Sequence, residues 1–553
     1  MAFLVLIARL FSWQVIKGKA LATQARGQYE VGTKLEAQRG SILASDGTYL
    51  AARSAGWLVT ASMPEIKNIT EVANKLAPLL INEGEETYDE EIRLKELLTK
   101  AGVVWIPLKH KVPDENKKNI DALQIEGIGF EEEETRSYPE ASTAAHLLGF
   151  VGKNIEGEDT GYFGLEGYYD LALAGKPGFL SSEKDARGVP ILLGNERQAS
   201  PVGGVDLITH IDKGIEILAE KKLKEGIEKY GAKGGSVIIT NPKSGAIIAS
   251  SSYPSYNPTE YSDFTNDLFR DPVVADAFEP GSVFKVIIMA AALDAGVVEP
   301  ETKCDICGGP LRIDKYLIET WNKEYRPDST MVDVIVHSDN VGMSFVGQKL
   351  GADRIYDYLD KFGIGKKTGI DLQGEASVKL RDKSTWNDVD VATASFGQGV
   401  AITPIQLLKA VGAIANQGVM VTPQVVGKLE SDGWYQEIEP DTGERIISED
   451  AAKNITAMMV EAAKNGESKW TYLRGFNVAG KTGTAQIPIA GHYDAEKTIA
   501  SFIGFAPANN PKFLMLVTLK EPTSSPWASE TAAPLWYSIA KDLFLRFGIQ
   551  PSN

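Results

Sequence analysis

The feature that most constrains this chain is a long helical stretch with strand-like segments at both of its ends. Residues 234–249 have the pattern of a β-hairpin. Helical spacing then predominates to about residue 465, after which strand patterns return at 498–505 and 513–519 and a terminal helix is expected near 532–547. Strands on either side of a helical block predict an α+β fold, in which one sheet is assembled from distant parts of the chain.

Composition changes along the chain predict where it divides. The 553 residues are enough for about three folding units. Residues 197–204 are small and turn-forming, which is typical of a boundary between domains. Residues 38–61 alternate turn residues with short β-type runs. We therefore predict a multidomain chain with a mixed α/β domain over 17–200 and a second domain over 203–553.

The charge balance limits the partners of the chain. Lys and Arg number 57 and Asp and Glu number 74, which gives a net charge of −17. So acidic a chain is a poor partner for nucleic acid, and we expect none. Hydrophobic residues at 43% and charged residues at 24% are ordinary for a globular protein, which excludes disordered, collagen-like and multi-span membrane proteins. No motif requires a cofactor.

The N-terminus, residues 1–16, is apolar apart from Arg9, Ser12 and Gln14. As a helix it would reach only about 24 Å, whereas a spanning helix needs about 20 apolar residues. We interpret it as a partial membrane anchor, with an interfacial or a buried helix as alternatives. Lys17 and Lys19 follow the run and disfavour a removable signal peptide. By the positive-inside tendency this basic flank would lie in the cytoplasm.

A serine and a lysine stand at the start of a predicted helix over 286–293. Ser282 and Lys285 are three residues apart, so their side chains lie over the same helical face. An uncharged amine there could take the serine proton, and the free N–H groups of a helix N-terminus suit a developing oxyanion. Alone the pattern is weak, because a capping serine with a surface lysine is the commoner explanation.

A second polar motif consists of Ser338, Asp339 and Asn340, which interrupt two apolar segments. By itself it would be interpreted as a helix cap. A third motif runs from Lys481 to Thr484 on a predicted strand. Lys481 supplies a cation, Thr482 and Thr484 supply hydroxyls, and Gly483 permits the close approach of a substrate backbone, so an anionic carboxylate is the expected ligand. The three motifs in this order are typical of penicillin-binding proteins and class A β-lactamases.

Other patterns are rejected as sites. Residues 475–482 match a phosphate-binding loop, but a strand pattern follows where that loop needs a helix. A second K-T-G at 367–369 has loop composition, and no G-x-S-x-G elbow supports a serine–histidine–acid triad. Cys304 and Cys307 could be half of a zinc site, a redox pair or two free thiols. Because no second cysteine pair exists, we expect no metal site.

With these motifs the chain resembles the class B, monofunctional penicillin-binding proteins. The likeness covers most of the chain and rests, besides the three motifs, on segments 38–42, 136–139, 145–152, 164–169, 368–372, 395–404 and 501–507. Ala44 and Ser45 depart from the family, which usually has an acidic and a basic residue there. The resemblance implies a serine β-lactamase-like transpeptidase fold, with a central antiparallel sheet flanked by helices, on an N-terminal pedestal domain of the dimerisation type.

The resemblance also implies roles for the site residues. Ser282 would attack the D-Ala-D-Ala peptide of a stem, with Lys285 as its general base. Ser338 would relay the proton to the leaving amine, and Asn340 would hold Lys285 and the substrate amide. The carboxylate would be bound by the third motif, that is by Lys481, Thr482, Gly483 and Thr484. The backbone N–H groups of Ser282 and Thr484 would form the oxyanion hole.

Partners and location follow from the same resemblance. The substrates would be peptidoglycan stem peptides on lipid-linked muropeptide chains, and β-lactams would acylate Ser282. A polytopic glycosyltransferase and other division or elongation proteins would be the partners. The resemblance implies a single-pass protein of the bacterial cell membrane whose catalytic half is extracytoplasmic, contrary to the basic flank after residue 16. The family anchor is longer than residues 1–16, which suggests a truncated start.

Two alternatives remain open. One is a β-lactam-hydrolysing or D,D-carboxypeptidase enzyme of the same fold, and the other is a non-catalytic penicillin-binding scaffold. The nearest match to the E-x-x-L-N loop of class A β-lactamases is Glu461 to Asn465, but Lys464 replaces the leucine and the segment has a helical pattern. The presence of all three motifs favours an enzyme.

Overall fold

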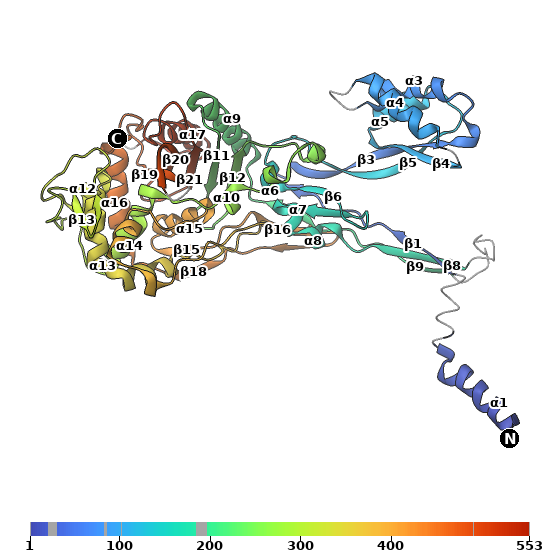
Figure 1. Ribbon diagram of the computed structural model, residues 1–553, viewed down its shortest axis with the longest axis horizontal. Helices are drawn as coiled ribbons and strands as arrows, with labels where there is room; N and C mark the ends of the chain where they lie inside the picture. The colour runs from blue at the N-terminus through green and yellow to red at the C-terminus, as the bar shows by residue number, and fades with distance from the viewer. Residues whose placement is uncertain are drawn as a thin grey trace.

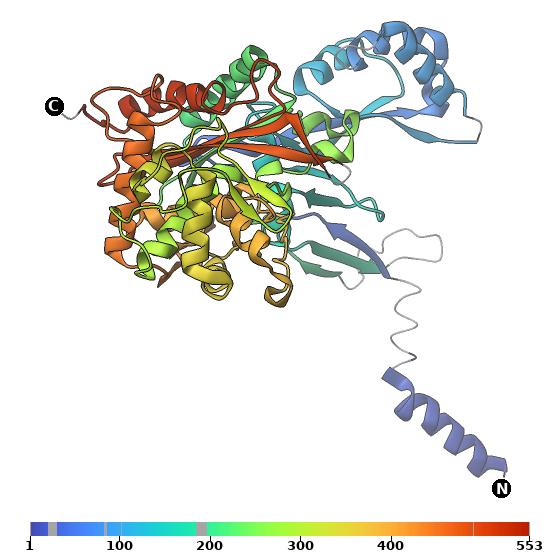
Figure 2. The same cartoon turned by 60° about the vertical axis from the view of Figure 1, so that its left-hand side comes forward.

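The computed structural model describes residues 2–19, 21, 30–81, 86–100, 102–183, 196–489 and 492–551. Figure 1 shows a C-terminal half, coloured green to red, in which helices surround a sheet. An N-terminal half, coloured blue to teal, projects from one side of it, and the turned view of Figure 2 shows the same arrangement. Mixed helices and strands confirm the predicted α+β class.

The C-terminal half is built on a five-stranded antiparallel sheet. Its strands lie in the order β12-β11-β21-β20-β19. They are β11 (Gly234–Thr240), β12 (Ile247–Tyr253), β19 (Ala479–Ile489), β20 (His492–Ala506) and β21 (Phe513–Lys520). The first two come from one end of this half and the last three from the other, which confirms a sheet assembled from distant segments.

Helices cover both faces of this sheet. Side chains alternate between the two faces along each strand, so apolar side chains on each face need a covering layer. Val237 and Val517 pack with α9 (Lys213–Tyr230) and α17 (Ala532–Arg546) on one face. Their neighbours Ile238 and Leu516 belong to the main core on the other face. The helices of that core include α11 (Lys285–Asp294), α15 (Pro404–Ala415) and α16 (Glu449–Asn465).

Shorter elements complete the C-terminal half. Its remaining helices are α10 (Pro272–Ala275), α12 (Met331–Val336), α13 (Asn340–Lys361) and α14 (Asp388–Ser395). Two small antiparallel pairs join β13 (Leu311–Ile313) to β14 (Tyr316–Ile318) and β15 (Val419–Val421) to β18 (Thr442–Arg445). Strand β10 is short and spans only Asp206–Thr209.

The N-terminal half contains a lobe with its own core. In it β3 (Tyr49–Ser62) pairs with both β4 (Trp105–Val112) and β5 (Ile128–Ser137). Helices α3 (Ile69–Leu80), α4 (Thr87–Leu98) and α5 (Asp114–Asp121) cover these strands (Figure 1). The predicted run of small strands over 38–61 is therefore mostly one long strand, preceded by the two-residue β2 (Ile42–Leu43).

One sheet joins the two halves. It has the order β17-β16-β10-β2-β3-β4, with β5 alongside β3. Here β10 (Asp206–Thr209) pairs in parallel with β2, and β16 (Val426–Ser431) and β17 (Trp434–Glu437) extend the sheet from the C-terminal half. Ile42 and Leu207 are fully buried in the same core. The sheet thus contains residues from both sides of the predicted boundary at 200–203.

A buried ionic cluster joins separate segments of the N-terminal half outside the core of this lobe. The Glu166 carboxylate is fully buried and accepts hydrogen bonds from Arg39 at 2.7 Å and from Arg136 at 2.6 Å. Arg39 also pairs with Asp170 at 2.8 Å. These contacts join the segment before β2, the end of β5 and the helices α7 (Gly164–Tyr168) and α8 (Asp170–Ala174).

The remaining N-terminal elements are short. They are α6 (Ala145–Leu148), β6 (Phe150–Lys153) and β7 (Asp159–Tyr162), and a three-stranded sheet of β1 (Glu30–Leu35), β8 (Gly178–Glu183) and β9 (Glu196–Ala199).

Helix α1 (Ala2–Phe11) continues into a π-helical turn over Ser12–Ile16, and its apolar side chains are exposed. In the part of the chain that the structure describes, no helix combines the length and the apolar character needed to cross a membrane.

Candidate active site

Ser282 lies in a 3-10 turn, η5 (Gly281–Phe284), that leads directly into α11. The prediction placed it in the first turn of the helix itself, and the tighter turn is the difference. Gly281 has a φ of +57°, which a residue with a side chain rarely adopts. Its neighbours Val283 and Phe284 are fully buried, whereas Ser282 is partly exposed. The core thus anchors the turn and leaves one hydroxyl facing outward.

The cleft at Ser282 is small, with a volume of about 90 Å³. Ser338, Asn340 and Thr484 line it together with Ser282, so the three sequence motifs meet there as predicted. No side chain of the described residues hydrogen-bonds the Ser282 hydroxyl. The hydroxyl is therefore free to approach a ligand.

Lys285 is the first residue of α11 and is completely buried. Its Nζ donates hydrogen bonds to Asn340 Oδ1 at 2.8 Å and to Ser338 Oγ at 3.2 Å, as well as to the Ser338 carbonyl. Burial, with the nearby charge of Lys481, lowers the pKa of Lys285 to about 7. A large share of this amine is thus uncharged in neutral solution, as a base needs to be.

Ser338 occupies the turn between α12 and α13 with a φ of +56°. The next residue, Asp339, caps α13 by accepting from the N–H groups of Val341 and Gly342. Asn340 donates to the Glu319 carbonyl at 3.0 Å. The helix-cap interpretation of this motif is therefore correct for Asp339, and the cap holds the two flanking side chains toward Lys285.

Lys481 lies on β19, and its side chain is on the same sheet face as position 483, which packs against the η5 segment. Its Nζ donates to Ser338 Oγ at 3.0 Å, so the Ser338 hydroxyl lies between the two lysine amines. Burial lowers the pKa of Lys481, and the charge of Glu467 opposes this change. The three motifs thus form one hydrogen-bonded group around Ser338.

Glu467 belongs to the cleft and was not predicted from the sequence. It lies two residues after the end of α16 and lines the cleft, and its carboxylate accepts a hydrogen bond from Thr482 Oγ1 at 2.6 Å. Its charge raises the pKa of Lys285 and of Lys481, against the larger effect of burial. No spacing rule singles out a lone acidic residue after a helix, so only the folded chain reveals it.

The glycine and threonines of the third motif differ in their surroundings. A Cβ at Gly483 would lie 2.7 Å from Val283 Cγ1 and 3.1 Å from the Pro280 carbonyl oxygen. The backbone that approaches Gly483 closely is therefore the segment that carries Ser282, whereas the prediction expected a substrate backbone. Thr482 directs its hydroxyl to Glu467. Thr484 lines the cleft, and its Oγ1 accepts from the N–H of Ala528 at 3.0 Å.

Two tryptophans on the rim of the cleft were also not predicted. Trp321 and Trp527 have ring centroids 5.3 Å apart, and 47% and 39% of their surfaces are exposed. Both line the cleft with Ser282. They come from different loops, so no local sequence pattern marks either of them as a residue of the cleft.

The rejected phosphate-loop pattern at 475–482 overlaps the site at Lys481 and Thr482, but it runs into β19 and not into a helix. The other patterns do not line the cleft. The second K-T-G is a loop whose Thr368 donates to Glu375. Glu461 and Asn465 are hydrogen-bonded to each other within α16. Cys304 and Cys307, whose state the sequence left open, form a disulfide. Among the described residues no cluster of His, Cys, Asp and Glu is arranged to hold a metal ion.

Comparisons with known proteins agree with this geometry. The family model of the penicillin binding protein transpeptidase domain matches residues 235–544, more than half of the chain. That of the penicillin-binding protein dimerisation domain matches residues 34–209. The chain belongs to the class B penicillin-binding proteins.

Relatives of this penicillin-binding protein match it over nearly its whole length. Stage V sporulation protein D of Bacillus subtilis is 31% identical over 99% of this chain and 84% of its own. The probable peptidoglycan D,D-transpeptidase PenA of Neisseria meningitidis is 29% identical over 99% of this chain and 91% of its own. Penicillin binding protein 3 of Mycobacterium tuberculosis, solved in complex with aztreonam, has a TM-score of 0.71 at 24% identity and covers 94% of this chain and 98% of its own.

Proposed function

We propose that this class B penicillin-binding protein performs its peptidoglycan D,D-transpeptidase reaction through an acyl-enzyme on Ser282, with Lys285 as the general base. The single observation that carries the proposal is the buried amine of Lys285, whose pKa is lowered to about 7. An uncharged amine one turn from a partly exposed hydroxyl is suited to accept its proton.

In the acylation step, Ser282 Oγ attacks the carbonyl carbon of the penultimate D-Ala, and its proton passes to Lys285 Nζ. The backbone N–H groups of Ser282 and Thr484 stabilise the resulting oxyanion. The C–N bond then breaks, and the leaving D-Ala amine receives a proton through Ser338. This relay is supported by the distances of 3.2 Å and 3.0 Å from Ser338 Oγ to the amines of Lys285 and Lys481.

In the second step, the amine of a neighbouring stem attacks the ester carbon of the acyl-enzyme. One amine proton returns to the lysine and serine pair, and the C–O bond to Ser282 breaks. The products are a cross-linked peptide and the free serine. Transfer, rather than hydrolysis, requires that the amine reach the ester before water does.

Lys481 and Thr484 are proposed to bind the substrate carboxylate, and Asn340 to bind its amide. Gly483 allows β19 to lie close to the Ser282 turn. Thr482 contributes by holding Glu467, with which it is hydrogen-bonded at 2.6 Å. β-Lactams, which carry a carboxylate and a reactive amide, would occupy the same cleft.

The cellular setting is part of the proposal. We infer lipid-linked muropeptide chains as substrates, a polytopic glycosyltransferase and other division or elongation proteins as partners, and an extracytoplasmic catalytic domain over 203–553 on a pedestal over 17–200. The exposed apolar side chains of α1 support contact of residues 1–16 with the cell membrane.

A fluorescent penicillin tests the proposal directly. The wild type should carry a label that survives denaturation and gel electrophoresis, because the acyl bond is covalent. Ser282→Ala should carry none, since the nucleophile is absent. Ser54→Ala, at an exposed serine of β3, is the matched control and should be labelled as the wild type is. An unlabelled wild type would leave the scaffold alternative standing.

Transfer and hydrolysis are separated by an acceptor. With a D-Ala-D-Ala pentapeptide donor and a D-amino acid as acceptor, the exchanged peptide should exceed the hydrolysed tetrapeptide in mass spectrometry. Hydrolysed product alone would favour the D,D-carboxypeptidase alternative.

A further inference from the structure

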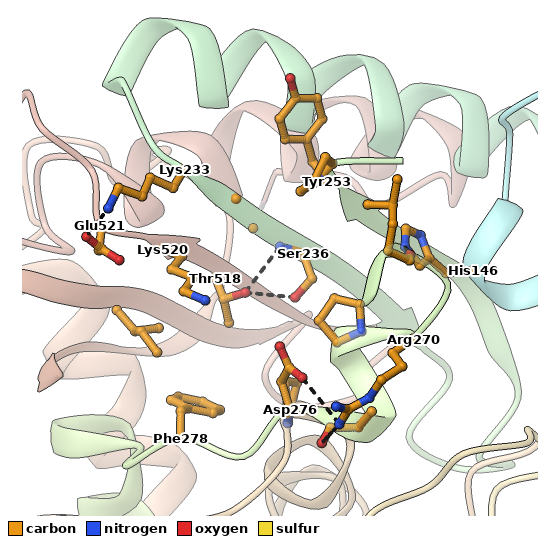
Figure 3. Close-up of a pocket in the computed structure, with 18 of the residues that line it drawn as sticks. His146, Lys233, Ser236, Tyr253, Arg270, Asp276, Phe278, Thr518, Lys520 and Glu521 are labelled. Carbon is orange, nitrogen blue, oxygen red and sulfur yellow. Dashed lines mark hydrogen bonds and ion pairs between the residues drawn. The ribbon is translucent and has the colours of Figure 1, made fainter. Parts of the chain in front are cut away.

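A second cavity, of about 670 Å³, lies at the end of the five-stranded sheet where β11 begins and β21 ends. Figure 3 shows its lining. Ser236 and Thr518 form part of the floor, and His146 of the N-terminal half and Arg270, next to α10, belong to the wall. This volume lies within the range of about 300–1,000 Å³ that is usual for ligand sites.

The floor of this cavity lies on the sheet face that carries the main core, and its residues Ser236 and Thr518 are only 2% and 8% exposed. Residues two apart on a strand share a face, so Ser236 lies beside Ile238 of the core, and Thr518 lies beside Leu516. Ser236 Oγ and Thr518 Oγ1 are hydrogen-bonded at 2.7 Å. This polar pair lines the cavity next to the apolar core residues Ile238 and Leu516.

The same face connects the cavity with the Ser282 cleft. A row of paired residues runs across four strands, from Ala485 through Ile499 and Lys520 to Gly234. Ala485 lines the cleft, and the other three line the cavity. Strands are spaced about 4.8 Å apart, so the backbone at Lys520 lies only about 10 Å from that at Ala485.

The charges of the cavity leave one cation unpaired. Lys233 pairs with Glu521 at 2.7 Å, and Arg270 lies 3.9 Å from Asp276. Lys520 has no ion pair within the described ranges, although its side chain is exposed at the cavity. An exposed ammonium beside two hydroxyls is suited to a carboxylate.

The rest of the lining fits a peptide. Tyr253, Pro254, Pro272 and Phe278 give apolar surface, and Phe278 lies four residues before Ser282. Asp267 and Asp276 are acidic groups that can pair with an amine. A ligand with carboxylates, an amine and short apolar side chains matches this combination of surfaces.

We propose that this cavity binds a second peptidoglycan stem peptide, with a carboxylate of the peptide on Lys520, while the first stem occupies the Ser282 cleft. The inference rests on the proposed function for the identity of the ligand. The shared sheet face and the separation of about 10 Å place the second peptide within reach of the cleft.

Binding to the acylated protein tests this proposal. The full-length chain is first acylated with penicillin, which fills the Ser282 cleft, and its acylation is measured by mass. A disaccharide tetrapeptide is then titrated in a calorimeter. We expect saturable binding to the acylated wild type and at least tenfold weaker binding to acylated Lys520→Glu. The tetrapeptide with its carboxylates amidated should bind as weakly to the wild type.

Lys512→Glu is the matched control, because Lys512 is exposed just before the other end of β21 and does not line the cavity. It should bind the tetrapeptide as the wild type does, and both variants should melt and acylate as the wild type does. Acylated wild type that binds no tetrapeptide, or equal binding by the two variants, would overturn the cavity proposal alone. A wild type that penicillin does not acylate would overturn the proposed function and this inference with it.

Discussion

At the scale of single residues, the cleft depends on the protonation of a buried lysine. Desolvation of Lys285 disfavours its charged form, and the Lys481 ammonium disfavours it further. Glu467 acts in the opposite direction. Asp339 acts in the same direction as Glu467, and the balance of the four influences brings the pKa to about 7, where the amine changes its charge within the physiological range.

The rate of penicillin acylation should therefore rise with pH through about 7, as Lys285 loses its proton. In Glu467→Gln a group that stabilises the ammonium is lost, so the pKa falls and the rising limb should move to lower pH. The second-order acylation rate constant, measured by stopped flow from pH 5 to 9, gives the rising limb of the wild type and that of the variant. Glu530→Gln, at an exposed glutamate, should leave the limb in place. A shift to higher pH in Glu467→Gln would contradict this account.

At the scale of elements, the contact between β19 and the turn η5 sets the width of the cleft. Gly483 has no room for a side chain, because Val283, Ser501 and Pro280 surround the position. Any atom added there must separate the strand from the turn. The strand carries Lys481 and the turn carries Ser282, so a change in their separation should alter the proposed acylation of Ser282.

Gly483→Ala should lower the acylation rate constant by about tenfold or more, since overpacking costs about 1–3 kcal/mol and about 1.4 kcal/mol corresponds to tenfold. Gly443→Ala is the matched control on β18, where the nearest atom to a Cβ is 3.5 Å away. It should acylate at the wild-type rate. Equal rates for the two variants would show that the contact at Gly483 does not set the width of the cleft.

The contact of α9 with β12 contains a buried acid. Glu216 accepts hydrogen bonds from Ser250 N–H and from the Ser251 hydroxyl, both at 2.7 Å, and is fully buried. Burial, with the charge of Glu220, raises the pKa of Glu216 to about 8 from its ordinary value of 4.5. Between these values the unfolded chain loses the proton and the folded chain keeps it, so stability falls as pH rises through this window.

Glu216→Gln should remove this fall, because the amide resembles the protonated acid and does not ionise. The loss of unfolding free energy between pH 5 and pH 7 should be smaller in the variant by about 3 kcal/mol. Urea unfolding at the two pH values measures it. Glu228→Gln, at an exposed position of α9, should keep the wild-type dependence.

At the scale of the whole molecule, the ionic cluster around Glu166 joins three segments of the N-terminal half. Removing one partner from a buried ion pair leaves the others uncompensated, which costs about 3–5 kcal/mol. The free energy of unfolding of Glu166→Ala, measured with urea, should therefore be lower than that of the wild type by this amount. Glu156→Ala, at an exposed glutamate, should unfold as the wild type does. A wild-type midpoint for Glu166→Ala would contradict a structural role of the cluster.

Much of the molecule could be predicted from local patterns, and the remainder depends on contacts between distant segments. The β-type runs at β11 and β21 and the helical pattern at α17 predicted strands of the central sheet and one of the helices that cover it. The pairing of β2 with β10 was not foreseen, because strands of two and four residues have too little pattern to detect. Glu467 and the two rim tryptophans were missed for the same reason, since each acquires its role only from neighbours far along the chain.

The sheet shared by both halves has a mechanical consequence. Strand β2 pairs with β10, and β10 with β16, so a pull on the segment that precedes Ile42 is transmitted through backbone hydrogen bonds into the half that carries Ser282. A flexible tether between independent modules would dissipate such a force. The segment before Ile42 and the turn that carries Ser282 are therefore parts of one mechanically continuous body.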